Sequence, residues 1–383
     1  MLELPPLALY VHIPWCARKC PYCDFNSHEL TGDIPELAYI EALIKDLATE
    51  SDKLFDRPLQ SIFIGGGTPS LFSAAALSKL LTAIEAQIQF ADNIEITLEA
   101  NPGTAEAHRF SEFRDAGINR LSLGIQSFDD LQLQKLGRIH DSQQARDAIE
   151  MAKDAGFDNF NLDLMYGLPG QTVRAAIEDL QVASCYDPPH LSWYQLTIEP
   201  NTVFYRRPPE LPRDALIEEI EAEGHQLLRD RRLVQYEVSA YAVPGHASRH
   251  NINYWRFGDY LGIGAGAHGK ISFPADDKIL RTRKLKQPGH YLNAHDGWNA
   301  EIVEVEPQQR SLEYLMNVLR LRKGFTAEQF EHGTGLTFDT IAKRVEYLAR
   351  NNLVSVTERR DGRYYSASDA GYRVLNSLLE EFI

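Results

Sequence analysis

A regular alternation of short apolar runs and longer amphipathic stretches constrains the fold of this chain most strongly. The apolar runs lie at 7–13, 61–64, 95–99, 120–125, 159–165 and 190–198. Helix-like stretches follow them at 35–54, 73–89, 104–116, 129–156, 172–185 and 213–231. Strands that alternate with helices form parallel sheets. The pattern therefore predicts an α/β fold, a partial (β/α)6 TIM-like barrel over residues 1–235.

Polar residues and glycines stand at the end of each predicted strand. They are Tyr10, His12, residues 65–68, Glu99, Asn101, Gln126, Asp163, Gln195 and Thr197. In barrels of this kind chemistry gathers where the strands end and the following loops begin. Six successive strands that bring polar groups to one rim predict a ligand pocket at the barrel mouth.

After residue 235 the alternation breaks down. Residues 237–242 are expected to add a strand, and 270–286 are typical of a β-hairpin, so 236–309 is predicted to be a linking segment. Residues 310–383 predict a separate winged-helix-like α+β domain. Its helices are expected near 311–322, 326–332, 337–350 and 369–381, with strands at 354–358 and 364–367.

The charge pattern argues against nucleic acid as a partner of that last domain. Residues 310–383 hold eleven Lys and Arg against ten Asp and Glu, and the net charge of the 383-residue chain is −15. Binding to phosphates needs concentrated positive charge. We therefore expect the winged-helix-like domain to serve as a cap or docking surface.

Three of the four cysteines lie within eight residues, as Cys16, Cys20 and Cys23 in a Cys-x3-Cys-x2-Cys spacing. This spacing supplies three thiolates, enough for three irons of a 4Fe-4S cubane, and leaves one iron for an outside ligand such as S-adenosylmethionine. Zinc is the alternative, but structural zinc sites have four protein ligands, and Cys185 is expected to lie far away at a helix end. The prediction is a 4Fe-4S cluster.

The cysteine usage also fits a reducing compartment, because it is too sparse and too clustered for a disulfide framework. The N-terminus lacks a basic segment followed by an apolar one, and no apolar run is long enough for a membrane span. We therefore expect a cytoplasmic protein without a transmembrane segment.

Several short motifs resemble known proteins. The cysteine spacing with Tyr22 resembles the signature of the radical S-adenosylmethionine superfamily. The segments 10–16, 23–26, 65–69, 99–103 and 124–128 are similar to its coproporphyrinogen oxidase-like branch. Within that branch, Phe25 and the segment His-Asn-Ile-Asn-Tyr-Trp at 250–255 resemble the heme chaperones.

The resemblance implies a set of site residues. The cluster would be held by Cys16, Cys20 and Cys23. The residues expected to bind S-adenosylmethionine are Tyr10, Tyr22, Gly66, Gly67, Thr68, Glu99, Gln126, Arg138 and Asp163. Glycines let the backbone approach a charged ligand, whose ends their exposed amides can bind, and a guanidinium can bind a carboxylate with two hydrogen bonds.

The resemblance further implies that His250 is the residue that binds heme. Imidazole is a common axial ligand of heme iron, and Tyr254 and Trp255 can pack on a porphyrin face. A histidine beside aromatic residues is otherwise more often structural. A Gly-x-Gly-x-x-Gly match at 264–269 is not assigned to a dinucleotide, because a strand rather than a helix is predicted after it; its glycines are expected to let the backbone pass near a ligand.

Two functions follow from the resemblance. The first is a heme chaperone that binds the cluster, S-adenosylmethionine and heme, and passes heme to apo-hemoproteins, membrane-bound respiratory subunits among them. The second is an oxygen-independent coproporphyrinogen III oxidase, an enzyme. Such oxidases carry a fourth cysteine where this chain has Phe25, and an N-terminal extension before the first strand. The sequence therefore favours the chaperone, without oxidase activity.

Overall fold

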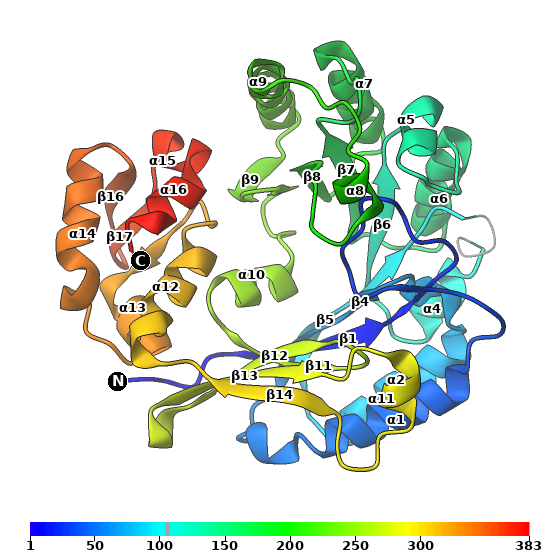
Figure 1. Cartoon of the computed structure of the whole chain (residues 1–383), viewed down its shortest axis with the longest axis horizontal. Coiled ribbons are helices and arrows are strands. Elements are labelled where there is room, and N and C mark those ends of the chain that lie inside the picture. Colours follow the sequence, from blue (N-terminus) through cyan, green and yellow to red (C-terminus); the bar gives the residue numbers. More distant parts are fainter. Residues whose placement is uncertain (104–107, 383) are drawn as a thin grey trace.

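The computed structural model describes residues 1–103 and 108–382 and is built around one large mixed sheet (Figure 1). Neighbouring strands in its centre are parallel. These central strands are β1 (Leu7–Ile13), β4 (Leu59–Gly66), β5 (Phe90–Ala100), β6 (Arg120–Gln126), β7 (Phe160–Tyr166) and β8 (His190–Gln195). They follow each other in chain order, as in a partial (β/α)6 barrel. The predicted fold class is confirmed.

Helices cover the outer side of this sheet (Figure 1). They are α1 (Glu36–Ala48), α2 (Ala74–Glu85), α4 (Phe110–Asp115), α5 (Asp130–Lys135), α6 (Ser142–Asp154), α7 (Val173–Ser184) and α9 (Asp214–Asp230). Of the helix predicted at 104–116, residues 104–107 lie outside the described residues. The single helix predicted at 129–156 is wrong, because α5 ends before Gly137 and Asp141 begins α6 with a capping box.

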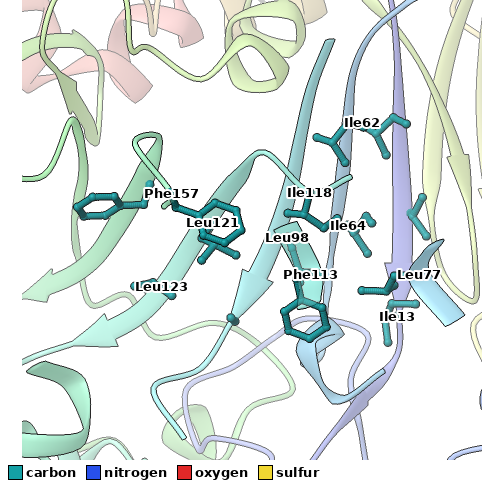
Figure 2. Close-up of a cluster of buried hydrophobic side chains, with 14 of the residues drawn as sticks. Ile13, Ile62, Ile64, Leu77, Leu98, Phe113, Ile118, Leu121, Leu123 and Phe157 are labelled. Carbon is teal, nitrogen blue, oxygen red and sulfur yellow. The ribbon is translucent and has the colours of Figure 1, made fainter. Parts of the chain in front are cut away.

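Side chains that alternate along the strands separate an apolar face from a polar one. The outward side chains pack under the helices with those of α2 and α4, and Figure 2 shows Ile62, Ile64 and Leu98 in one apolar cluster with Leu77 and Phe113. The inward side chains are largely polar. They include Ser61, Glu95, Thr97, Glu99, Arg120, Ser122, Asn161, Asp163, His190 and Ser192. The barrel therefore has a polar interior, which is where a charged ligand can be accommodated.

The sheet continues beyond the barrel on both sides. Next to β8 lie β10 (Ala240–Ala242) and β9 (Val234–Glu237), an antiparallel pair where the sequence predicted one strand. Next to β1 lie β11 (Asp259–Ile263), β12 (His268–Phe273), β13 (Lys278–Lys284) and β14 (Asn299–Glu304). The β12–β13 hairpin matches the prediction, whereas β11, parallel to β1, was not predicted. We call β11–β14 the sheet extension.

The C-terminal part contains helices around a small sheet of order β15–β17–β16. Its elements are α12 (Pro307–Val318), β15 (Phe325–Thr326), α13 (Ala327–Thr334), α14 (Asp339–Arg350), β16 (Val354–Arg359), β17 (Gly362–Ala367), α15 (Asp369–Arg373) and α16 (Leu375–Glu380). Its apolar core also includes Leu2, Phe257 and Ile279, so it packs on the N-terminal segment and the sheet extension.

Shorter elements complete the described chain. They are β2 (Trp15–Cys16), β3 (His28–Glu29), η1 (Ser51–Lys53), η2 (Pro69–Leu71), α8 (Val203–Arg206), α10 (Arg249–Trp255), η3 (Pro274–Asp276) and α11 (Pro288–Leu292). Among the described residues, no helix combines the length and apolar character needed to cross a bilayer.

Candidate functional site

A cavity of about 450 Å³ opens at the ends of the parallel strands. This volume lies in the range of small-molecule sites, roughly 300–1,000 Å³. The predicted residues that line it come from six places in the chain. They are Cys16, Cys20, Tyr22, Cys23, Gly66, Gly67, Thr68, Glu99, Gln126, Arg138 and Asp163. Parallel strands bring their ends to one edge, which is why these distant residues meet.

The cysteine loop, residues 16–27, forms one wall of the cavity. Cys16 is buried and paired through β2 with β3, whereas Cys20 and Cys23 are partly exposed, and all three are free thiols. Burial raises the pKa of Cys16 to about 11 and also raises that of Cys23. Bound cations favour the thiolate form of such groups. Three free thiols in one loop are a donor set that suits an iron-sulfur cluster.

The glycine loop, residues 65–69, is fixed against the end of β1 by its own amides. Gly66 donates its N–H to Glu99 Oε2 at 3.0 Å. The amides of Gly67 and Thr68 donate to the carbonyls of Ile13 and Trp15, each at 2.7 Å. The expectation that these amides are exposed for a ligand is therefore wrong. A Cβ on Gly67 would lie 2.3 Å from the Trp15 carbonyl oxygen, so the glycine serves close packing.

Arg138 joins the cysteine loop to two strand ends. Its Nη1 donates to Cys20 Sγ at 3.6 Å, and its Nη2 donates to the Gly124 carbonyl at 2.8 Å and to Asn101 Oδ1. Asn101 in turn donates to Thr68 Oγ1 at 2.9 Å. The sequence placed Asn101 at the rim but not among the binding residues. Its position between Thr68 and Arg138 makes it part of the site.

Two carboxyl groups, Glu99 and Asp163, line the cavity and interact electrostatically. Burial raises the pKa of Glu99 to about 7, against the hydrogen bond from Gly66, and the charge of Asp163 adds to the rise. Burial likewise raises the pKa of Asp163, although Ser122 and Asn161 donate to it at 3.0 and 2.8 Å. Such carboxyls can both accept and donate hydrogen bonds near neutral pH.

Gln126 has a left-handed backbone, with φ of 70°, at an irregularity in the β6–β7 pairing. Its Oε1 accepts a 2.7 Å hydrogen bond from the hydroxyl of Tyr194, which also lines the cavity. Strained backbone of this kind persists where surrounding contacts hold it. Tyr194 was missed from the sequence because an aromatic residue in an apolar run gives no signal of a binding role.

Tyr10 and His250 do not line the cavity. The Tyr10 hydroxyl donates to His12 Nδ1 at 3.0 Å, and its ring stacks on Phe63. His250 lies on α10, near the starts of the strands, where its Nδ1 is 3.2 Å from Ser61 Oγ. Burial lowers the pKa of His250 to about 3, with a smaller contribution from Arg120. The structure therefore separates His250 from the cysteine loop.

The 264–269 segment is not a nucleotide loop. It is followed by β12, as expected, and Gly264 approaches the end of β1 so closely that a Cβ would lie 2.3 Å from the His12 carbonyl oxygen. Gly266 approaches Asn26 of the cysteine loop, and Gly269 lies in β12 against Thr282. The expectation that these glycines let the backbone pass near a ligand stays a prediction.

Family comparisons agree with this geometry. The radical SAM superfamily model matches residues 10–183, and the HemN C-terminal domain model matches 305–371. Curated proteins named "Heme chaperone HemW" align along the whole chain. The protein from Haemophilus influenzae is 50% identical over 100% of this chain and 99% of its own length, and that from Escherichia coli is 48% identical over 100% of both. The chain belongs to the HemW family.

A solved structure shows the same fold. The coproporphyrinogen III oxidase (HemN) from Escherichia coli superposes with a TM-score of 0.82, over 99% of this chain and 90% of that one, at 22% identity. This chain thus shares the architecture of that oxidase. In this chain, Phe25 is 58% exposed and lines the cavity. At this sequence position the oxidases are expected to carry a cysteine.

Proposed function

We propose that this chain is a heme chaperone that uses a 4Fe-4S cluster and S-adenosylmethionine. The observation that carries the proposal is full-length identity of 48–50% to proteins named heme chaperones, together with a cavity that combines three free thiols with polar strand ends. The superfamily implies the cluster and S-adenosylmethionine.

The residues of the cavity suit these two groups. We propose Cys16, Cys20 and Cys23 as the cluster ligands, since their thiols are free and lie in one loop. A cluster with an open iron can supply an electron to bound S-adenosylmethionine.

The other residues of the cavity would hold S-adenosylmethionine, and two of them are already oriented. Arg138 would bind its carboxylate, and Glu99 would accept hydrogen bonds from ribose hydroxyls or the amino group. Because the amides of the glycine loop are already bonded, a ligand amino group would meet carbonyl oxygens there. The remaining proposed contacts in the cavity come from Tyr22, Thr68, Gln126 and Asp163, whereas Tyr10 lies outside its lining and is proposed from the family resemblance alone.

Heme would bind apart from this cavity if His250 is its ligand. The start of α10 is held by Glu95, which accepts hydrogen bonds from the amides of Arg249 and His250 at 3.1 Å. Since the His250 side chain is buried, at 8% exposed, ligation of a group as large as heme would require α10 to move away from Ser61 and Glu95. We propose that this displacement accompanies heme uptake, and that apo-hemoproteins are the acceptors.

The test is an anaerobic hemin titration of reconstituted protein, wild type beside His250→Ala, followed by absorption spectroscopy. His268→Ala is the matched control, because His268 is exposed and lies in the sheet extension. We expect saturable, stoichiometric binding by wild type and control, and a shifted or weakened Soret band in His250→Ala. Absence of specific binding in all three proteins would contradict the chaperone function.

The cluster assignment has its own test. Cys20→Ala should lose the 4Fe-4S absorption after reconstitution, whereas Cys185→Ala should keep it, because Cys185 is exposed and lies outside the cavity. A cluster that persists in Cys20→Ala would overturn the ligand set. Turnover of coproporphyrinogen III by the reconstituted wild type would favour the oxidase function instead.

A further inference from the structure

Asn26 connects the cysteine loop to a distant part of the chain. It follows Cys23 by three residues, and its Nδ2 donates to the carbonyl oxygens of Ala265 and Lys286 at 2.8 and 2.9 Å. Its own carbonyl accepts a 2.9 Å hydrogen bond from Nε2 of His12 at the end of β1. Asn26 is thus bonded on one side to the barrel and on the other to the sheet extension.

The 264–266 turn has space for the Asn26 side chain because its last residue is a glycine. Gly266 has φ of 82°, and a Cβ there would lie 2.3 Å from Asn26 Nδ2. Its amide donates to the Leu285 carbonyl at 2.9 Å, which keeps the 264–266 turn beside the end of β13. This bond keeps the carbonyls of Ala265 and Lys286, which accept from Asn26, next to each other.

Buried side chains fix this turn from behind. The amide of Gly264 is 3.0 Å from the Tyr291 hydroxyl, and the amide of Ala265 is 2.8 Å from the Tyr39 hydroxyl. Asp46 accepts hydrogen bonds of 2.6 Å from the Tyr291 hydroxyl and from Lys284 Nζ. Since Lys284 and Asp46 are 1% and 0% exposed, the support is rigid and shielded from water.

The loop on the other side of Asn26 is also tied together. Lys19 Nζ donates to the carbonyls of Phe25 and Ser27 at 3.0 and 3.1 Å, and Ser27 Oγ lies 3.8 Å from Cys23 Sγ. These bonds hold the cysteine loop together, and only Asp24 and Phe25 separate Asn26 from Cys23 in the sequence. A displacement of Asn26 would therefore also move the Cys23 thiol.

We propose that Asn26 is a positioning residue for the iron-sulfur cluster, which it holds in place by bonding the cysteine loop to the 264–266 turn. The sheet extension then acts as the fixed support of a site that is otherwise built from the barrel. This inference rests on the cluster assignment proposed above.

The test uses full-length, anaerobically reconstituted Asn26→Ala and Asn26→Asp. Aspartate keeps the size but places a carboxylate against two carbonyl oxygens. Asn351→Ala is the matched control, since Asn351 is exposed and its Nδ2 donates to the carbonyl of Tyr347 in the helix that it follows. Cluster release to a chelator and the electron paramagnetic resonance spectrum of the reduced cluster, with and without S-adenosylmethionine, are measured beside thermal unfolding of the apo-proteins.

We expect both Asn26 variants, which lose two hydrogen bonds, to release the cluster at least about fivefold faster than wild type, the factor that corresponds to one ordinary hydrogen bond. Their spectra should change while the control stays like wild type. Tyr291→Phe, which removes a hydroxyl from the support, should act in the same direction and serves where the Asn26 variants fold poorly. Wild-type release rates and spectra in all of them would overturn the proposal. A wild type that binds no cluster would instead refute the proposed function itself.

Discussion

The guanidinium of Arg138 lies against the thiol of Cys20, with Nη1 3.6 Å from Sγ. This contact places a guanidinium directly beside one of the proposed cluster ligands. The same side chain is bonded to Asn101 and to the carbonyl of Gly124. One residue therefore couples the cysteine loop to the strand ends that would hold S-adenosylmethionine.

Replacing Arg138 by Lys should weaken the binding of S-adenosylmethionine although the charge is kept. Lysine lacks the planar fork that bonds Cys20 on one nitrogen and Gly124 and Asn101 on the other. We expect a loss of tenfold or more, about 1.4 kcal/mol. Anaerobic calorimetry with reconstituted protein measures it. Arg174→Lys, at an exposed α7 position, is the control and should bind as wild type. Equal affinities for both variants would contradict this role.

The raised pKa of Glu99 predicts a pH-dependent effect on stability. The folded-state pKa of about 7 exceeds the ordinary value of 4.5, so the folded protein favours the protonated carboxyl. This contribution is complete below about pH 4.5 and is lost as the pH rises through 7. Glu99→Gln mimics the protonated form, and its amide oxygen can still accept from Gly66.

The stability of Glu99→Gln relative to wild type should therefore rise between pH 5 and pH 8. A pKa shift of this size corresponds to a change on the order of 3 kcal/mol. Urea unfolding of the apo-proteins at several pH values measures it. A constant difference across this pH range would show that Glu99 titrates normally.

The central fold could be predicted because its physical signals are local. The run at 7–13 matches β1, and each parallel strand has apolar residues on the outer face where helices cover it. Two strands of the sheet extension, β11 and β14, carried no such signal, in contrast to the predicted β12–β13 hairpin. All residues of β14 but Asn299 are exposed, and the glycines around β11 suggested a loop, so only the pairing with β1 reveals the strand.

The candidate site also contains residues that the sequence predicts and residues that it does not. The strand-end residues were predictable because parallel topology places them together. Asn26 and Tyr194 were not, since their roles depend on partners such as Ala265 and Gln126, which sequence spacing does not bring near. The misassigned amides of the glycine loop have a similar cause: their acceptors lie on β1 and β5, or just beyond them.

The left-handed backbone of Gln126 predicts a difference between two truncations. Both Gln126→Ala and Gln126→Gly remove the hydrogen bond from Tyr194, but only glycine adopts a φ of 70° without steric cost. We expect Gln126→Gly to be more stable than Gln126→Ala by about 1 kcal/mol. Urea unfolding of both proteins decides it. Alanine being the more stable of the two would mean that the backbone at this position is not strained.

Gly224 lies in the middle of α9, where alanine normally stabilises a helix by about 1 kcal/mol. Here the opposite should hold, because a Cβ on Gly224 would lie 2.0 Å from Cη2 of Trp193 on β8. Trp193 is buried in the main core and cannot move without displacing its neighbours. We expect Gly224→Ala to destabilise the protein by about 2 kcal/mol, as overpacked cores do.

The control for Gly224 is Gly289 on α11, where a Cβ would meet no atom within 4 Å. Gly289→Ala should leave the free energy of unfolding unchanged or raise it slightly, because only helix propensity changes. Equilibrium unfolding of the two variants separates propensity from packing. Should Gly224→Ala prove as stable as Gly289→Ala, α9 would have room to shift outward from β8, and the glycine would not be required for the close contact between them.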